Sequence, residues 1–297
     1  MIRKSQVAVA IAALIAAPAF AAVGFDANVE LDSTYQGNNR GLSQTGRVEL
    51  NAYSKTDKGG GFVAGRASYM AGKGGAATVD DMWVQIGNAS GDIKLGRFEA
   101  ADLFPLGKDV IVEDGGTPSG YRSNVFRGRS GDRFHGALTL NAGGGVGFEL
   151  GILGNGDADP SSNKNHIGLR PVVSFATSGL NIRAGFETGK DANGNKVNGG
   201  GVTVGTTMAG AGLNVNLSSG KVGGVKGSSF GVNATFGPAG VGYVMDKNGS
   251  NKDNVLYAAY SLPLFDTGAT ITPAVSYGKA TGEDRRVGVR VRVNYAF

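Results

Sequence analysis

The chain of 297 residues contains no cysteine, few prolines and a single tryptophan. The lack of cysteine excludes a disulfide framework and thiolate metal sites. Beyond the N-terminus, no run approaches the 18 or more consecutive apolar residues of a membrane helix. The 52 glycines have no G-X-Y period, which excludes collagen, and the finely interleaved charges exclude a disordered chain. The stability of the folded chain must therefore come from hydrogen bonds between backbone groups rather than from disulfide bonds.

The first 21 residues have the features of a secretory signal peptide. A basic start at Arg3 and Lys4 precedes an apolar run, which ends in the small-x-small sequence Ala19-Phe20-Ala21. We predict cleavage before Ala22, so that residues 22–297 form the exported chain. Without Arg3 and Lys4, the net charge falls from +5 to about +3, which is too small to indicate nucleic-acid binding.

Apolar and polar residues alternate in segments of about ten residues, a pattern typical of β-strands with two different faces. The pattern is clearest at 286–297, where valines and aromatics alternate with polar residues that include Arg290 and Arg292. Burying these arginines in a dry core would be prohibitively costly. The polar faces of the strands are therefore expected to be in contact with water.

Seven short glycine-rich turns and eight longer polar loops join 16 such segments. An even strand number, with short connections at one end and long ones at the other, is typical of an outer-membrane β-barrel. The predicted fold is therefore all-β, a transmembrane antiparallel barrel. Its predicted strands are 23–35, 44–56, 61–71, 79–88, 91–98, 122–141, 146–154, 166–177, 180–189, 201–209, 211–219, 228–237, 240–246, 254–265, 268–278 and 286–297.

Two alternatives remain open at this point. The stretch Arg129-Ser130-Gly131-Asp132 fits either a bulge within one long strand at 122–141 or a turn between two strands, which would change the strand count. A secreted soluble sandwich or solenoid would also have one wet face. Aromatic residues at segment ends, such as Tyr295 and Phe297, favour a membrane interface instead, and no 20 to 50 residue repeat supports a solenoid.

Three short motifs are the final VRVNYAF, IKLGR at 93–97 and EDGG at 113–116. They resemble sequences of the 16-stranded Gram-negative outer-membrane porins, the general diffusion porins. VRVNYAF is similar to the C-terminal strand of these porins, and IKLGR is similar to the end of their fifth strand. EDGG at 113–116 resembles the PEFGG tip of their third loop, although Val112 replaces Pro and Asp114 replaces Phe. The resemblance implies that a loop at about 99–121 folds into the lumen, that the barrel assembly machinery reads the C-terminal strand, and that the protein is a homotrimer.

The candidate site is a pore constriction in which an acidic loop faces a basic wall. By resemblance, Asp109 and Glu113 match the spacing of two constriction carboxylates. Arg97 shares the parity of lipid-facing Ile93 and Leu95, so it reaches the lumen only if Gly96 marks a bulge. The predicted loop acids are Asp109, Glu113, Asp114, Glu99 and Asp102, and the predicted wall residues are Arg47, Arg66, Arg97, Arg127, Arg129, Arg133, Arg290 and Arg292. The surplus of arginine predicts a mild anion preference.

The loop also contains apolar residues, which we expect to pin it against the inner wall rather than bind substrate. The alternative is that its acids and the arginines form solvated ion pairs that hold the loop in place. Lumen aromatics at Tyr53, Trp83 and Tyr121 suggest stacking on sugar rings as a weaker alternative. The apolar loop residues are Leu103, Phe104, Pro105, Leu106, Val110, Ile111 and Val112.

The predicted function is a water-filled channel for passive diffusion of small hydrophilic solutes and ions, surrounded by outer-membrane lipid. A porin selective for sugars or organic acids is the alternative within transport. A barrel enzyme or an adhesin is the alternative from other classes. Catalysis has little support, because the two histidines, His135 and His166, have no partner at a recognisable spacing. No cofactor, metal or nucleic-acid partner is predicted.

Overall fold

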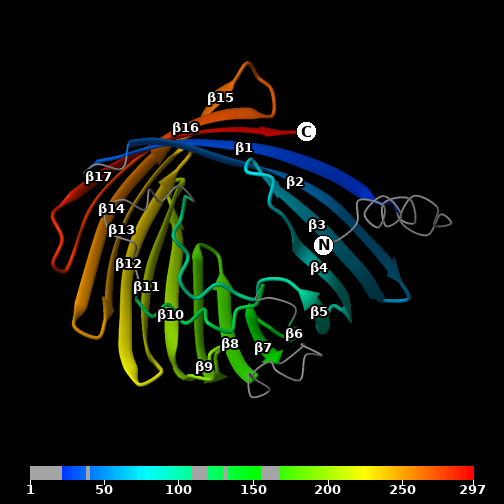
Figure 1. Cartoon of the computed structure of the whole chain (residues 1–297). Helices are drawn as coiled ribbons and strands as arrows, with labels where there is room; N and C mark the ends of the chain where they lie inside the picture. Colours follow the sequence, from blue (N-terminus) through cyan, green and yellow to red (C-terminus); the bar gives the residue numbers. More distant parts are fainter. Residues whose placement is uncertain (1–21, 38–40, 109–119, 130–132, 155–166) are drawn as a thin grey trace.

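The computed structural model describes residues 22–37, 41–108, 120–129, 133–154 and 167–297. The strands in these ranges form one antiparallel sheet in chain order, and β1 (Gly24–Gln36) also pairs with β17 (Arg286–Ala296). The β1–β17 pairing closes the sheet into a barrel (Figure 1). Closure removes both sheet edges, so the backbone groups of the wall are satisfied within the sheet.

The strand β14 (Asn251–Tyr260) and the short β15 (Leu262–Leu264) are two parts of one interrupted strand. Both pair with β16 (Ala269–Ala280), and only Ser261 separates them. The wall therefore has the predicted 16 crossings. The other strands are β2 (Gly41–Lys58), β3 (Gly61–Gly72), β4 (Ala77–Asn88), β5 (Gly91–Arg97), β6 (Phe134–Gly143), β7 (Val146–Gly154), β8 (Ile167–Thr177), β9 (Leu180–Lys190), β10 (Lys196–Met208), β11 (Ala211–Val222), β12 (Val225–Phe236) and β13 (Ala239–Asn248).

The burial pattern of the wall is the reverse of that of a water-soluble protein. Apolar side chains such as Leu217 and Val289 are exposed on the outside, whereas polar side chains such as Asn216 and Ser276 are buried on the inside. The alternation predicted from the sequence thus separates an apolar exterior from a polar interior, as in membrane barrels. None of the described residues forms a helix that is long and apolar enough to cross a membrane.

The prediction of one long strand at 122–141 was wrong. Only its second half is a strand, β6, which begins at Phe134. Residues 120–129 leave the sheet, because Ser123 and Arg129 have positive φ angles of 58° and 51° and Gly128 has a φ of 118°. These conformations cannot continue an extended strand. Residues 98–108 and 120–129 form two irregular stretches, which we call the inner segments.

Two of the predicted long loops are also shorter than expected. The predicted loops 220–227 and 247–253 are two-residue turns at Gly223-Gly224 and Gly249-Ser250. Gly223 and Gly224 both have positive φ, which suits a tight hairpin turn. The strands β11 to β14 consequently extend further than the sequence pattern indicated.

The inner segments pack against inward-facing residues of the wall (Figure 1). Phe104 packs against Val244, Val255 and Tyr257, and Leu106 lies beside this cluster. These contacts agree with the expected anchoring role of Phe104 and Leu106. Val110, Ile111 and Val112 lie outside the described residues, so the prediction that they anchor the loop remains a prediction.

Glycines in the wall make room for the aromatic side chains of the inner segments. A Cβ atom at Gly199, Gly220 or Gly227 would lie 2.5–2.8 Å from atoms of Tyr121. Tyr121 is 5% exposed. Burial raises the pKa of its phenol, and the negative charge of Glu187 raises it further, so the group stays neutral. Tyr121 is therefore a packing residue, and it is not accessible for stacking on a sugar.

Replacing Gly220 by valine tests whether this close approach holds the inner segment in place. We expect Gly220→Val to displace the Tyr121 ring and to destabilise the fold by about 1–3 kcal/mol, as overpacking does elsewhere. Thermal unfolding followed by circular dichroism in detergent measures the loss. Gly74→Val is the matched control, because nothing lies within 4 Å of a Cβ at Gly74. Equal melting temperatures for the two variants would contradict the packing role of Gly220.

Candidate functional site

A row of alternating acids and arginines lies on the inner face of β17, β1 and β2. Arg292 is 2.8 Å from Asp32 and 3.0 Å from Glu30. Glu30 also lies 3.5 Å from Arg47, and Asp32 lies 3.9 Å from Arg290. The register explains the contacts, because Asp32 stands directly opposite Arg292 and Glu30 directly opposite Arg47. We call this row, with its continuation on β3 and β4, the charge ladder.

The charge ladder continues through Arg66 on β3. Its guanidinium is 3.6 Å from Glu49 and 3.5 Å from Asp81, and it donates a hydrogen bond to Asn51 at 2.9 Å. The predicted wall arginines of β2, β3 and β17 thus all point inward, but each has a carboxylate beside it. The predicted wall of surplus positive charge is in fact a series of ion pairs.

A β-bulge gives the ladder two acids that sequence reasoning missed. The β3–β4 register shifts between Ala67 and Tyr69, so Asp80 and Asp81 together stand opposite Ser68. Both aspartates are buried, at 8% and 6% exposure. Strict alternation would place one of them on the outer face, and a bulge is the one local device that brings both to the same side. Two consecutive acids within an otherwise alternating strand were the available signal.

Arg129 pairs with these two aspartates rather than with an acidic loop. Its guanidinium lies 3.1 Å from Asp80 and 3.0 Å from Asp81. The prediction that Arg129 faces the loop acids across a gap is therefore wrong for the acids that the structure describes. Arg129 lies on the second inner segment, not on a strand, and it joins that segment to β4.

Arg127 also lies on the second inner segment, where it binds acids of the first. It is 3.3 Å from Glu99 and 3.6 Å from Asp102, and it donates a hydrogen bond to the carbonyl of Ala100 at 3.0 Å. Glu99 and Asp102 were expected to face the basic wall across the lumen. They instead hold the two inner segments together.

Arg97 is the last residue of β5. Gly96 has a φ of 121°, and the Arg97 Nε donates hydrogen bonds of 2.9 Å to the carbonyls of Val79 and Asp80. The predicted bulge at Gly96 is absent, because the β4–β5 register runs unbroken from Leu95 through Gly96 to Arg97, which stands opposite the outward-facing Met82. Arg97 instead caps the β4 backbone at the end of β5. Arg133 lies immediately before β6 and is half-buried.

The remaining predicted site residues lie on the loop tip. Asp109, Glu113 and Asp114 are outside the described residues. Their position in the lumen therefore stays a prediction, as does the inward fold of the whole loop at about 99–121.

Buried charges attach the inner segments to β8 and β9. Arg170 has no exposed surface, and it donates hydrogen bonds to the carbonyls of Ala101 at 2.7 Å and Ser123 at 3.2 Å. Glu187, equally buried, accepts hydrogen bonds from the backbone N–H groups of Val125 and Phe126. The wall thus satisfies backbone groups that would otherwise lack partners, because these segments have left the sheet.

Polar side chains of β11, β12 and β13 complete the attachment. Asn216 and Asn233 both donate to the carbonyl of Pro105, at 2.7 Å and 2.8 Å. Arg122 pairs with Asp246 at 2.9 Å. Like Asp80 and Asp81, Arg122 and Asp246 were not predicted as site residues. They are single charges from segments more than 100 residues apart, which no local pattern connects.

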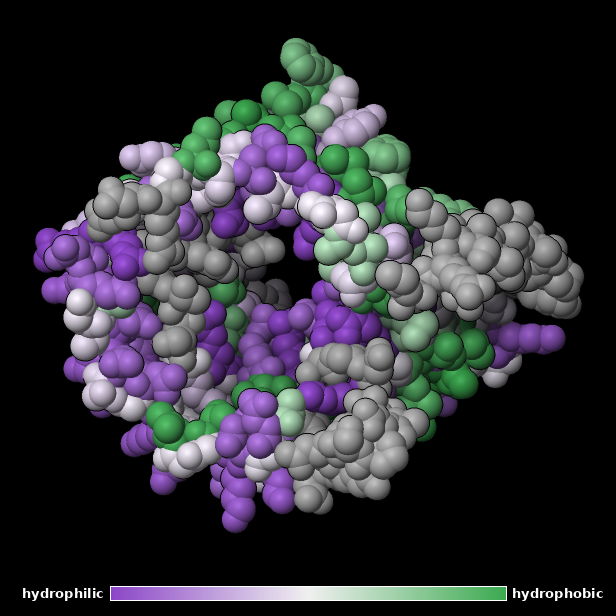
Figure 2. Space-filling model, viewed as in Figure 1, coloured by the Kyte–Doolittle hydropathy of each residue, from purple (hydrophilic) through white to green (hydrophobic). Residues whose placement is uncertain are grey.

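The barrel interior is consequently divided into two sides. The inner segments cover the side formed by β6 to β14 and meet the charge ladder at β4 through Arg129, whereas the rest of the ladder lies on β17 and β1 to β3. Figure 2 shows a hollow through the molecule in the same view. The described residues therefore leave an opening beside the charge ladder.

Solved structures with the same architecture support this description. An anion-selective porin from Comamonas acidovorans has a TM-score of 0.69 at 14% identity, over 93% of this chain and all of that chain. OmpF from Salmonella typhi, in complex with daunomycin, has a TM-score of 0.71 at 14% identity, over 94% of this chain and 98% of that chain. This chain has the porin fold. No protein-family model and no curated protein matches it, so the likeness is in the fold.

A further structure carries the same fold in an oligomeric form. OmpT of Vibrio cholerae, solved in its trimer form, has a TM-score of 0.68 at 15% identity, over 93% of this chain and 99% of that chain. The coverage of both chains is nearly complete, so the porin fold accounts for the whole barrel rather than for one part of it.

Neutralising the bulge acids tests their place in the lumen. In Asp80→Asn/Asp81→Asn, Arg129 loses both carboxylate partners while keeping its charge. We expect the anion-to-cation permeability ratio to rise by about twofold or more, because charges that line a pore tune which ions pass. Reversal potentials across a planar bilayer with a salt gradient measure this ratio.

The matched control is Asp57→Asn/Asp92→Asn, which removes two carboxylates near the turns at the other ends of β2 and β5. A shift of the same size in the control would mean that total charge, rather than the bulge, sets the permeability ratio.

Proposed function

We propose that this chain is an outer-membrane porin, a water-filled channel through which small hydrophilic solutes and ions diffuse passively. One combination of features carries the proposal. The barrel is closed, its exterior is apolar, and its interior is charged and hydrated. The inner segments cover this interior on one side only, and the molecule is hollow in the view of Figure 2. A soluble β-protein would not expose rows of valine, leucine and phenylalanine around its whole circumference. A filled barrel would not keep ion pairs in contact with water.

The charge ladder supports a mild anion preference, although its charges are paired. In each pair the arginine is nearer to water than the carboxylate: Arg47 is 43% exposed against 11% for Glu30, and Arg66 is 35% exposed against 8% for Asp81. A permeating ion therefore meets guanidinium groups first. Because Coulomb interactions weaken with distance and with hydration, the nearer positive groups dominate.

Two inward-facing cations add to this bias. Lys94 on β5 lies 4.4 Å above the ring of Trp83, and Arg183 on β9 stands at an inward position. Neither has an ion-pair partner among the described residues. Lys94 and Arg183 therefore add positive charge to the lumen wall beyond the arginines of the charge ladder.

The acidic loop tip is proposed as the opposing element. If Asp109, Glu113 and Asp114 reach the opening beside the charge ladder, a transverse field develops between the tip and the exposed arginines. Such a field orders water and hinders apolar molecules, which cannot replace the ordered water. The attachment of the inner segments on both sides of the tip supports this placement.

Assembly and location follow from the same proposal. We infer a homotrimer in the outer membrane of a Gram-negative bacterium, exported by a signal peptide cleaved before Ala22 and inserted by the barrel assembly machinery through the C-terminal strand. The trimer form of OmpT supports the homotrimer, and the porin fold supports the outer-membrane location. The cleavage site and the role of the C-terminal strand rest on the sequence.

A porin selective for sugars or organic acids is the second candidate. Tyr53 and Trp83 form an aromatic pair on the inner wall, with ring centroids 6.2 Å apart. Aromatic faces of this kind stack on sugar rings. Trp83 is already covered by the ammonium of Lys94, which makes the general channel the better supported candidate.

Single-channel recording of the refolded chain in a planar bilayer tests the proposed function. We expect discrete open steps, with a reversal potential that favours anions. Block of this current by millimolar oligosaccharide would support the sugar-selective candidate instead. A folded, inserted barrel without conductance would contradict both.

A separate prediction concerns the loop tip. Asp109→Asn/Glu113→Gln should raise the anion-to-cation permeability ratio while leaving the melting temperature unchanged, because hydrated lumen charges contribute little to stability. Reversal potentials and thermal unfolding provide the two measurements. Asp57→Asn/Asp92→Asn is again the charge-matched control, and an unchanged ratio would show that the tip lies away from the ion path.

A further inference from the structure

The outer surface of β9 to β14 carries a strip of lysines at the end of the barrel that bears the β9–β10, β11–β12 and β13–β14 turns. The lysines form three pairs of directly opposed residues across these hairpins. The pairs are Lys190 with Lys196, Lys221 with Lys226, and Lys247 with Lys252. All six stand at outward positions, and all but Lys190 are exposed. We call them the lysine strip.

Like charges directly opposite each other on neighbouring strands destabilise a sheet. The repulsion within three such pairs on successive hairpins therefore needs to be offset by a counter-ion. Within the described chain, Lys55 is the only lysine in an ion pair, with Asp57 at 3.0 Å. The lysine strip thus has no internal counter-ion in this part of the chain.

Acids of the same strands are segregated to the opposite face. The carboxylates of β9 to β14 are Glu187, Asp246 and Asp253, and each is buried at an inward position. The outward face therefore carries cations alone, and the wall separates them from the acids. A ligand that compensates the lysine strip must come from outside the barrel.

A groove runs beside the lysine strip because one row of outward residues is small. Gly200, Ser219 and Ser228 stand in register on β10, β11 and β12, and the same row continues to Lys247 and Lys252. The groove has a volume of about 720 Å³. Small side chains between larger neighbours leave this space open.

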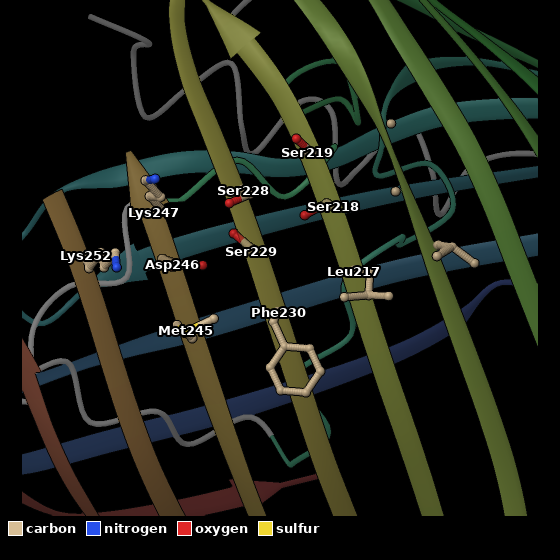
Figure 3. A pocket seen from close by; sticks show the side chains of 13 residues that line it. Leu217, Ser218, Ser219, Ser228, Ser229, Phe230, Met245, Asp246, Lys247 and Lys252 are labelled. Atoms are coloured by element: carbon tan, nitrogen blue, oxygen red, sulfur yellow. The ribbon is translucent and has the colours of Figure 1, made fainter. Parts of the chain in front are cut away.

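The next row of outward residues forms an apolar side of the groove. Val202, Leu217, Phe230 and Met245 stand in register, one outward position further from the turns. Figure 3 shows Leu217, Phe230 and Met245 on neighbouring strands, with Ser219, Ser228 and the two lysines further along the same side of the wall. Toward the turns, the lining of the groove therefore changes from apolar side chains to serines and then to lysines within a few residues.

We propose that the groove and the lysine strip bind a phosphate-bearing lipid of the surrounding membrane. Its phosphate lies on Lys247 and Lys252, the serines approach the glycerol or sugar backbone, and an acyl chain lies along Leu217, Phe230 and Met245. A lipid of this kind fits both parts of the surface. Its phosphate group neutralises the lysines that have no ion pair, and its acyl chain covers apolar side chains that face hydrocarbon. The proposal rests on the proposed membrane location of the barrel.

The test uses the full mature chain, refolded in a zwitterionic detergent and titrated with phosphatidic acid or with phosphatidylcholine of the same acyl chains. Native mass spectrometry measures the lipid retained on the folded barrel. We expect phosphatidic acid to be retained and phosphatidylcholine to be lost. Lys247→Gln/Lys252→Gln should weaken retention of phosphatidic acid by about tenfold or more, since each lysine near a membrane surface attracts anionic lipid.

The control is Lys55→Gln/Lys58→Gln, which removes two positive charges from β2 at the other end of the barrel. It should retain phosphatidic acid like the unmodified chain. Excess inorganic phosphate tests the role of the acyl chain: if it displaces phosphatidic acid readily, the surface is an anion patch and the lipid proposal fails. Equal retention of both lipids, or equal loss in the two double variants, would also overturn it.

A second readout separates binding from folding. Removing the repulsion between Lys247 and Lys252 should leave the melting temperature in lipid-free detergent equal or higher, and only the stabilisation by added phosphatidic acid should disappear. A variant that conducts ions normally but shows the unmodified lipid response would overturn the lipid site while leaving the channel proposal intact. A chain that never inserts would instead contradict the channel itself.

Discussion

Backbone pairing between β1 and β17 is the constraint on which the rest of the structure depends. In hydrocarbon, an unpaired N–H or C=O group costs several kcal/mol, so a sheet exposed to lipid is stable only when its two edges join. Once they join, every strand has one face toward the outside and one toward an enclosed space. The apolar exterior and the polar interior of the described wall follow from that division.

The interior then has to accommodate chain that is not part of the sheet. The inner segments gain none of the wall's regular backbone pairing, and side chains of the wall supply partners in its place: Arg170 for carbonyls, Glu187 for N–H groups and Asn216 for Pro105. Glycines such as Gly220 provide space for the aromatic anchors. One set of residues therefore fixes both the shape of the lumen and the side of the wall that the inner segments cover.

Sequence patterns predicted most of the wall, because side-chain alternation with a period of two is a local property. They failed at 122–141, where charged residues alternate as in a strand although positive φ angles at Ser123 and Arg129 take the chain out of the sheet. They also missed Asp80 and Asp81, because a bulge breaks the parity from which inward positions are counted. At both places the backbone departs locally from regular strand geometry. Both places also contribute side chains to the interior of the barrel.

The sequence by itself indicated the all-β class, 16 crossings of the wall, and the inward position of the arginines on β2, β3 and β17. Alternation and turn residues specify these through neighbours only a few positions apart. The tertiary structure alone decided which charges meet. Arg292 meets Asp32 across 260 residues because the barrel closes, Arg129 meets Asp80 because the second inner segment folds back over β4, and opposed lysines gather on one outer wall because three hairpins share a register. Charge pairing in this protein is set by register and closure, which no short stretch of sequence contains.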